Sequence, residues 1–324
     1  MLRSIFSRRT ACIQRALIEG LESRQLMAAA PPAPLSIDTN VQVMDDHKLW
    51  TNLSIVGTSA AEKITLTLSM GRKGPQLALK REVNKVLVDN TRLTGSYNSV
   101  YITGQGGNDT ITFKKVAGAV LITDPRSVQG SMSVSVNGGS GSDTIYMDAP
   151  QVYIPRGEYV EPDVWSYADG GSGNDILRAV EPADYDAGDA NLYGGSGNDK
   201  LYGASGNDFI FGGTGNDLIE GGDGGDVMGG EDGDDIVRGG NGYNHFYLSA
   251  GTDTLVGGED YDLFEIRRPY DGQRPLTPRG TIDGGDGENE LWYNQDSDLV
   301  NIVITSVDIL TKRSEPTLPP PTKG

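Results

Sequence analysis

Aspartate recurs in this sequence at a spacing that could place carboxylates in columns. From Gly194 onward the chain divides into blocks of nine residues, such as GGSGNDKLY and GGTGNDLIE, and position six is usually Asp. If two blocks complete one coil, residues eighteen apart lie on the same side. One side then stacks Asp199, Asp217, Asp235 and Asp253, and the other stacks Asp208, Asp226, Asn244 and Asp262.

Such columns require a cation. Carboxylates about 5 Å apart repel by about 1 kcal/mol in water and by about 3–4 kcal/mol at an effective dielectric of 20. Calcium suits the pattern because it accepts about six to eight oxygen ligands, backbone carbonyls included, in loose geometry, whereas magnesium demands a tight octahedron. Zinc would need His or Cys ligands, and the two histidines, His47 and His245, stand in unrelated contexts.

Each block also supplies the elements that position its aspartate. Glycine at positions one, two and four allows a turn with positive φ, and the last three residues can form a short strand with an inward middle side chain. That middle residue, at position eight, is apolar in every block, a regularity that disorder would not produce. It is Leu201, Ile210, Ile219, Met228, Val237, Phe246, Leu255 and Phe264 in the regular run and Ile111, Ile145, Leu177 and Leu291 in isolated copies. The pattern predicts an all-β fold, a parallel β-roll or β-helix solenoid.

The block GGxGxDxUx, in which U is apolar, closely resembles the RTX (hemolysin-type) calcium-binding repeat. The resemblance implies a parallel β-roll whose turn carbonyls and position-six aspartates bind several Ca²⁺ ions, and folding that follows calcium binding after export. The aspartate ligands that it implies are Asp143, Asp175, Asp199, Asp208, Asp217, Asp226, Asp235 and Asp262. The turn glycines that it implies are Gly195, Gly197, Gly206, Gly213, Gly215, Gly222, Gly224 and Gly233.

Several positions depart from this pattern. Asn244 weakens one side, and Leu248-Ser249 replaces the glycine pair before Asp253, so Asp253 is left out of the implied ligand set. Asp223 and Asp232, at position three, are expected to face solvent. A solenoid of the same kind without metal is the alternative.

The N-terminal half is rich in expected strands, such as 64–68, 86–88, 119–122 and 132–136. Block starts at Gly57, Gly104, Gly138, Gly170 and Gly194 are separated by 47, 34, 32 and 24 residues, and Glu62 stands at position six of the first, decayed block. We expect longer coils that taper into the roll, with the copies at Gly138 and Gly170 out of register. An independent β-sandwich is the alternative.

The first thirty residues suggest a targeting segment. They are basic and precede Pro31-Pro32-Ala33-Pro34, and Leu21–Met27 (LESRQLM) resembles the LEPRxLL-type export segment of planctomycete-type bacterial proteins. The resemblance implies a secreted, extracellular or cell-surface protein. An ordinary N-terminal extension is the alternative.

Charge and composition exclude several classes of partner. With 27 Lys and Arg against 45 Asp and Glu, the net charge is −18, which excludes nucleic acid as a partner. No stretch of 18 apolar residues predicts a transmembrane helix. One cysteine excludes a disulfide framework.

The sequence shows no recognisable catalytic motif. It lacks His-Glu-x-x-His and G-x-S-x-G, and His245, at position seven, is expected to face solvent. The leading hypothesis is a non-enzymatic calcium-binding module with a structural or adhesive role, with extracellular polysaccharide or cell-surface components as candidate partners. The alternative is a calcium-dependent polysaccharide lyase, epimerase or hydrolase, for which residues 146–167 offer tyrosines, Trp165 and acids.

We divide the chain into six parts on these grounds. They are a targeting segment (1–30), a strand-rich N-terminal region (31–137), a long-coil region with isolated blocks (138–193), the calcium-binding roll (194–265), a loop containing four arginines with closing strands (266–310) and a disordered tail (311–324).

Overall fold

The computed structural model describes residues 33–43, 49–71, 74–94, 99–115, 132–148, 164–180, 189–266, 279–293, 299 and 301–312. Contacts divide the chain into two units, Met1–Ala33 and Pro34–Gly324. All described strands belong to the second unit, and the described residues contain no α-helix. The predicted all-β class is confirmed, whereas the targeting segment lies outside the described residues.

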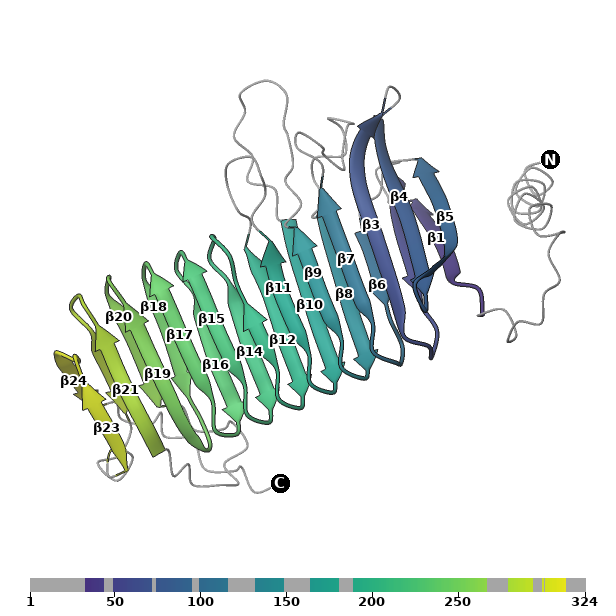
Figure 1. Cartoon of the computed structure of the whole chain (residues 1–324). Helices are drawn as coiled ribbons and strands as arrows, with labels where there is room; N and C mark the ends of the chain where they lie inside the picture. The colour runs from purple at the N-terminus through teal and green to yellow at the C-terminus, as the bar shows by residue number, and fades with distance from the viewer. Residues whose placement is uncertain are drawn as a thin grey trace, which may run out of the picture. The chain divides into compact units, whose positions relative to one another are not determined.

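Two twelve-stranded sheets, A and B, make up the described part of the second unit (Figure 1). Sheet A consists, in spatial order, of β1 (Ser36–Val43), β2 (Leu49–Val56), β6 (Ser99–Thr103), β8 (Met132–Ser140), β10 (Val164–Ser172), β12 (Ala190–Ser196), β14 (Phe209–Thr214), β16 (Val227–Asp232), β18 (Asn244–Leu248), β20 (Asp262–Ile266), β22 (Glu290–Tyr293) and β24 (Ile309–Lys312).

Sheet B faces sheet A across the core. In the same spatial direction, it consists of β5 (Val86–Thr94), β4 (Gly74–Val83), β3 (Glu62–Gly71), β7 (Thr110–Lys115), β9 (Thr144–Asp148), β11 (Ile176–Val180), β13 (Lys200–Tyr202), β15 (Leu218–Asp223), β17 (Ile236–Asn241), β19 (Thr252–Gly258), β21 (Arg279–Gly285) and β23 (Ile302–Thr305).

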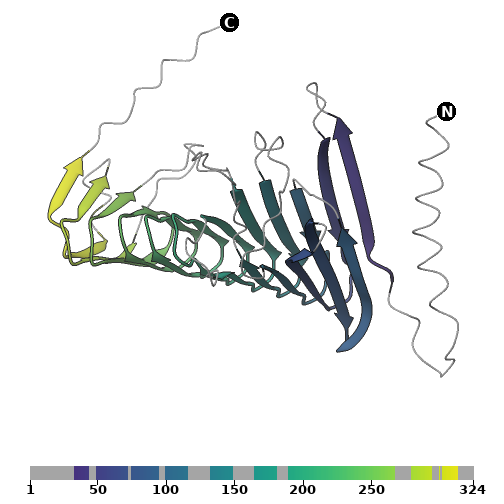
Figure 2. The same cartoon turned by 90° about the horizontal axis from the view of Figure 1, so that it is seen from above.

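From β6 onward the chain alternates between the two sheets, and each strand pairs in parallel with the equivalent strand of the next coil. In the regular run the register advances by eighteen residues, so that Leu192, Ile210 and Met228 are neighbours in sheet A. The view from above shows these coils as successive turns of the chain between the sheets (Figure 2). The solenoid with two blocks per coil is confirmed.

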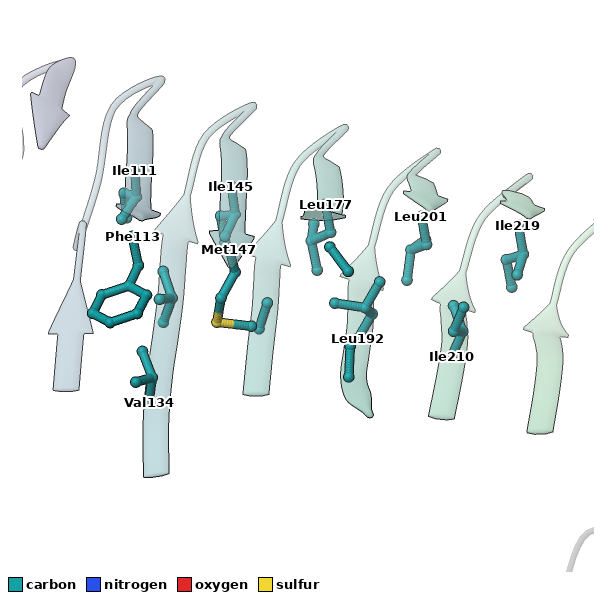
Figure 3. Close-up of a cluster of buried hydrophobic side chains, with 14 of the residues drawn as sticks. Ile111, Phe113, Val134, Ile145, Met147, Leu177, Leu192, Leu201, Ile210 and Ile219 are labelled. Carbon is teal, nitrogen blue, oxygen red and sulfur yellow. The ribbon is translucent and has the colours of Figure 1, made fainter. Parts of the chain in front are cut away.

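The core is a double row of apolar side chains between the sheets. Every position-eight residue is buried, and Figure 3 shows Ile145, Leu177 and Leu201 of sheet B pointing toward sheet A, with Leu192 and Ile210 opposite. The longer strands near the N-terminal end bury a second residue each, such as Phe113 and Met147. A narrow core of this kind explains how a chain with only 36 % hydrophobic residues can fold.

The N-terminal region differs from expectation in its hairpins. Strands β1 and β2 pair antiparallel, as do β3, β4 and β5. This region is nevertheless not an independent sandwich, because β2 and β3 pair in parallel with β6 and β7 of the stack. The expected strands 64–68, 86–88 and 132–136 lie in β3, β5 and β8, and 119–122 lies outside the described residues.

The C-terminal end continues the stack. The closing strands expected within 266–310 include β23 in sheet B and β24 in sheet A. The turn between them contains Ser306 with a φ of 54°, so the last coil repeats the path of the coils before it.

Candidate metal centre

A column of buried acidic side chains, column A, runs along one side of the coil stack. The backbone N–H of each member donates to the side chain of the next, as from Asp199 to Oδ1 of Asp217 at 2.7 Å. All members are at most 3 % exposed. They are Glu62, Asp109, Asp143, Asp175, Asp199, Asp217, Asp235 and Asp253.

Column A includes more turns than the sequence analysis placed in one register. Asp143 and Asp175 were expected to be out of register, but each donates its N–H to the next column member, at 2.7 Å in both cases. In the sequence, the additional residues of the longer coils fall between strands such as β9 and β10 and not within a six-residue turn. Asp109 and Asp253, which were absent from the implied ligand set, belong to the same column.

Column B runs along the opposite side of the regular coils with the same hydrogen-bond pattern. Its members are Asp208, Asp226, Asn244, Asp262, Asn289 and Asp308. Two of the six are amides, whereas every member of column A is acidic. The two sides of the stack therefore carry different densities of negative charge.

The two oxygens of a column carboxylate have different surroundings. Oδ1 accepts the N–H of the preceding turn, whereas Oδ2 is buried without a hydrogen-bond partner in Asp109, Asp143, Asp175, Asp199, Asp217, Asp226 and Asp235. A buried, unpaired oxygen of this kind is costly. Elsewhere Oδ2 of Asp208 accepts the N–H of Ala204, Oδ2 of Asp262 accepts that of Gly258, and the carboxylate of Asp253 accepts a backbone hydrogen bond from Ser249.

The first glycine of each turn leaves room beside this unpaired oxygen. A Cβ on Gly170 would lie 2.5 Å from Oδ2 of Asp175 and 2.6 Å from the carbonyl oxygen of Gly194 in the next coil. Gly138, Gly194 and Gly221 show the same arrangement. A carboxylate oxygen and a main-chain carbonyl thus converge on a space that any larger residue would fill. We call this space the cradle.

The implied turn glycines at positions two and four share one backbone conformation. All eight have positive φ, between 101° and 147°. A Cβ on Gly213 would lie 2.0 Å from the carbonyl oxygen of Gly195, and one on Gly215 would lie 1.9 Å from that of Gly197. Their carbonyls therefore face the next coil, and the carbonyls beside the unpaired carboxylate oxygens belong to position one.

Asparagine supplies its own donor in this cradle. Nδ2 of Asn244 donates to the carbonyl of Gly242 at 3.1 Å, and Nδ2 of Asn289 donates to the carbonyls of Asp286 and Ser306 at 3.1 Å. The amide nitrogen thus occupies the space that Oδ2 occupies elsewhere. These two turns require no cation.

Burial dominates the electrostatics of the columns. The pKa of Asp199 is raised from 3.8 to about 7, mainly by burial and also by the charges of Asp175 and Asp217, although the N–H of Asp175 lowers it. Burial likewise raises the pKa values of Asp109, Asp226, Asp235 and Asp253 to about 7. It raises those of Asp175 and Asp262 to about 6, and shifts those of Asp143, Asp208 and Asp217 upward.

The donor set fits a hard cation. No group of three or more His, Cys, Asp or Glu side chains converges on one point within the described residues, so a bound ion would take much of its coordination from main-chain oxygens. Calcium accepts such mixed oxygen sets. The residues that would hold it are the column aspartates and the turn glycines, both those at position one and the implied ones at positions two and four. Calcium bound there would supply the positive charge that these carboxylates lack.

Comparison with protein families matches residues 89–113, 193–228 and 229–264 to the RTX calcium-binding nonapeptide repeat (4 copies). The chain carries RTX calcium-binding repeats. The matched ranges contain the turns of Asp109 and of Asp199 through Asp262, and the RTX turns of Asp143 and Asp175 join them only in the structure. No curated protein matches the sequence.

Position five of the RTX turn forms an outer ladder that the sequence analysis missed. The N–H of Asn216 donates to Oδ1 of Asn198 at 2.8 Å, and the N–H of Asp234 donates to Oδ1 of Asn216 at 2.9 Å. These side chains are exposed. The recurrence of Asn before the position-six Asp was the available signal. Asp223 and Asp232, at position three, are exposed as expected.

The other candidate residues do not come together in the described structure. Tyr146 lies in β9 of sheet B, whereas Tyr167 lies in β10 of sheet A, 5.3 Å from Tyr193 between ring centroids. His245 is half-buried rather than open to solvent, with Nε2 3.2 Å from Oε2 of Glu265. Residues 149–163, His47 and three of the four loop arginines lie outside the described residues, and Arg279 begins β21.

Proposed function

We propose that this chain is an exported calcium-binding protein whose roll folds when calcium binds, and that it acts outside the cell or on its surface as a structural or adhesive module rather than as an enzyme. The observation that carries the proposal is the set of buried, unpaired Oδ2 atoms along column A. Beyond Glu62, no cationic side chain pairs with a column A carboxylate in the described structure.

The family match supports calcium as the ion, and calcium-coupled folding would suit a protein that folds only after export. Extracellular calcium modules bind with dissociation constants of about 10⁻⁴–10⁻³ M. At such affinities the metal would be scarce in the cytosol and plentiful outside, so the roll would stay unfolded until export. Within the described residues no helix is long and apolar enough to span a membrane.

The structural role is supported by the way calcium would be used. The candidate ligands belong to the turns that hold successive coils together, and their carboxylates are buried within the stack rather than open at its surface. Calcium in these positions would link coils. An adhesive or structural module needs such stability outside the cell.

Calcium titration of the purified chain, followed by circular dichroism, tests the proposal. We expect β-structure to appear as calcium rises through about 10⁻⁴–10⁻³ M, and Asp235→Asn to raise the midpoint several-fold. Asp232→Asn is the matched control, since Asp232 lies in the same turn but is exposed, and it should leave the midpoint unchanged. Complete folding in EDTA would refute calcium-coupled folding.

The role outside the cell has its own test. Fractionation of cells expressing the full chain, and the same chain without residues 1–30, should show the full chain outside and the truncated chain inside. Assays on uronate and sulfated polysaccharides, with calcium and with EDTA, should show binding without turnover. Calcium-dependent turnover would overturn the non-enzymatic assignment.

A further inference from the structure

Column A begins at a residue that has no turn before it. In the column, one carboxylate oxygen of each aspartate accepts the N–H of the preceding turn. Glu62 is the first member, so its Oε1 has no such donor. Instead, Nη2 of Arg81 donates to Oε1 of Glu62 at 2.5 Å, and the hydroxyl of Thr58 donates to the same atom.

Arg81 is buried at the end of the stack. It lies in β4, opposite Ile64 of β3, and its side chain is 1 % exposed. Its Nη1 lies 3.3 Å from Oδ2 of Asp89 in β5. A buried guanidinium is costly unless it is paired, and here its partner is the terminal carboxylate of a column of like charges.

The turn of Glu62 otherwise repeats the geometry of the aspartate turns. A Cβ on Gly57 would lie 2.5 Å from the carbonyl oxygen of Gly104 and 2.9 Å from Oε2 of Glu62, as at the other position-one glycines. The N–H of Glu62 donates to Oδ1 of Asp109 at 2.7 Å. Arg81 thus takes the place of a preceding turn's N–H at Oε1, while Oε2 of Glu62, like the Oδ2 atoms of the column, has no hydrogen-bond partner in the described structure. The positive charge beside this first carboxylate belongs to the chain.

We propose that Arg81 is a built-in cation that closes the N-terminal end of column A, so that the hairpin sheet of β3, β4 and β5 holds its fold without calcium. The parallel edge of β3 then offers a preformed template for β7 and the calcium-dependent coils beyond it. The hairpins suit this role because their contacts are local in sequence and form quickly. This inference rests on the proposed calcium-dependent folding of the roll.

Hydrogen exchange measured by mass spectrometry on the full chain, in EDTA and in calcium, tests the inference. In EDTA we expect the amides of residues 62–94 to remain protected while those of 194–265 exchange like an unfolded chain. In calcium both regions should be protected. Loss of protection in both regions in EDTA would overturn the template and leave calcium-coupled folding intact, whereas protection of 194–265 in EDTA would refute calcium-coupled folding itself.

Variants test whether the protection of residues 62–94 depends on the ion pair between Arg81 and Glu62. In EDTA, Arg81→Gln should lower the protection of residues 62–94 by about a hundredfold or more, because a lone buried carboxylate remains. Arg238→Gln is the control, since Arg238 is exposed and pairs with an exposed Glu220, and it should leave that protection unchanged. Equal protection in Arg81→Gln and the wild type would overturn the proposal.

A double variant separates the charge of Arg81 from a general loss of folding. Glu62→Gln with Arg81→Gln removes both charges and keeps hydrogen-bonding groups in place. We expect it to recover at least part of the protection lost in Arg81→Gln, in EDTA. If it exchanges as fast as the single variant, the counter-charge role of Arg81 is wrong, even where the single variant does not fold in calcium.

Discussion

At the scale of single residues, the two oxygens of each column carboxylate have different hydrogen-bond partners. In Asp217, Oδ1 holds the coil before it by accepting the N–H of Asp199, while Oδ2 has no partner. The first interaction needs only the fold, but the second is satisfied only when a positive charge enters the cradle. We therefore expect a single aspartate to stabilise the stack in calcium and to destabilise it without calcium.

The pH dependence without metal follows from the raised pKa values. A rise from 3.8 to about 7 costs about 4 kcal/mol at neutral pH for one group, and the five aspartates with a pKa of about 7 would together exceed the stability of about 5–15 kcal/mol of an ordinary domain. The folded state binds protons more tightly than the unfolded state, so its stability is fullest below pH about 4 and is lost as pH rises to about 7.

Urea unfolding in EDTA checks this sign. We expect the midpoint to fall as pH rises from about 4 to about 7 and then to level off. In calcium the trend should reverse, because protons compete with calcium for the same carboxylates. A midpoint in EDTA that rises between these pH values would contradict the assignment of the buried carboxylates.

Asn244 allows a test in which a carboxylate is added to a column instead of removed. Asn244→Asp replaces the amide that donates to Gly242 with a carboxylate in the same cradle, so we expect lower stability in EDTA and at least one additional bound calcium ion. Equilibrium dialysis against labelled calcium measures the stoichiometry. Asn241→Asp, at an exposed position of the same turn, should add no tightly bound ion.

At the scale of the elements, the six-residue turn sets the spacing of the coils. In the turns that begin with glycine, Oδ2 and a carbonyl occupy the place of a side chain at position one, although the φ of that glycine is ordinary. Glycines at positions two and four combine positive φ with the close approach of the coil before, whereas Gln105 and Glu231 adopt positive φ at position two without being glycine. The turn therefore tolerates insertions between strands but not within itself.

Gly215→Ala tests this constraint. Its φ of 126° is strained for alanine, and the new Cβ would lie 1.9 Å from the carbonyl of Gly197. We expect a loss of at least about 2 kcal/mol in calcium, measured by urea unfolding. Gly225→Ala is the control, because Gly225 has ordinary φ and its Cβ would lie 3.0 Å from its nearest neighbour. Equal losses in both variants would show that backbone strain is not the cause.

At the scale of the whole molecule, the net charge of −18 makes two explanations of calcium dependence possible. One is general screening of negative charge, and the other is coordination in the cradles. We expect about 1 M sodium chloride, which shortens the Debye length to about 3 Å, to leave the roll unfolded in EDTA. Calcium in the millimolar range should fold it at low salt, with magnesium much less effective. Circular dichroism under the three conditions decides between the explanations, and folding in sodium chloride alone would favour screening.

Much of the regular roll could be read from the sequence, because each turn has a fixed length. A strict interval of eighteen residues predicts which aspartates share a side, and an apolar residue at every position eight predicts the core. Asp199, Asp217 and Asp235 lie in one column as that interval predicts. The N-terminal turns could not be assigned in this way, because insertions of different length make the intervals between them unequal. Their common register is evident only from the hydrogen bonds between coils.

The sequence by itself determined the repeat, the inward row and the oxygen-rich turns that favour calcium, because these depend only on spacing along the chain. The tertiary structure alone decided that Glu62, Asp109, Asp143 and Asp175 extend column A. It also decided that Arg81, nineteen residues after Glu62, closes the column. An antiparallel hairpin brings those two charges together, and a contact of this kind leaves no period in the sequence.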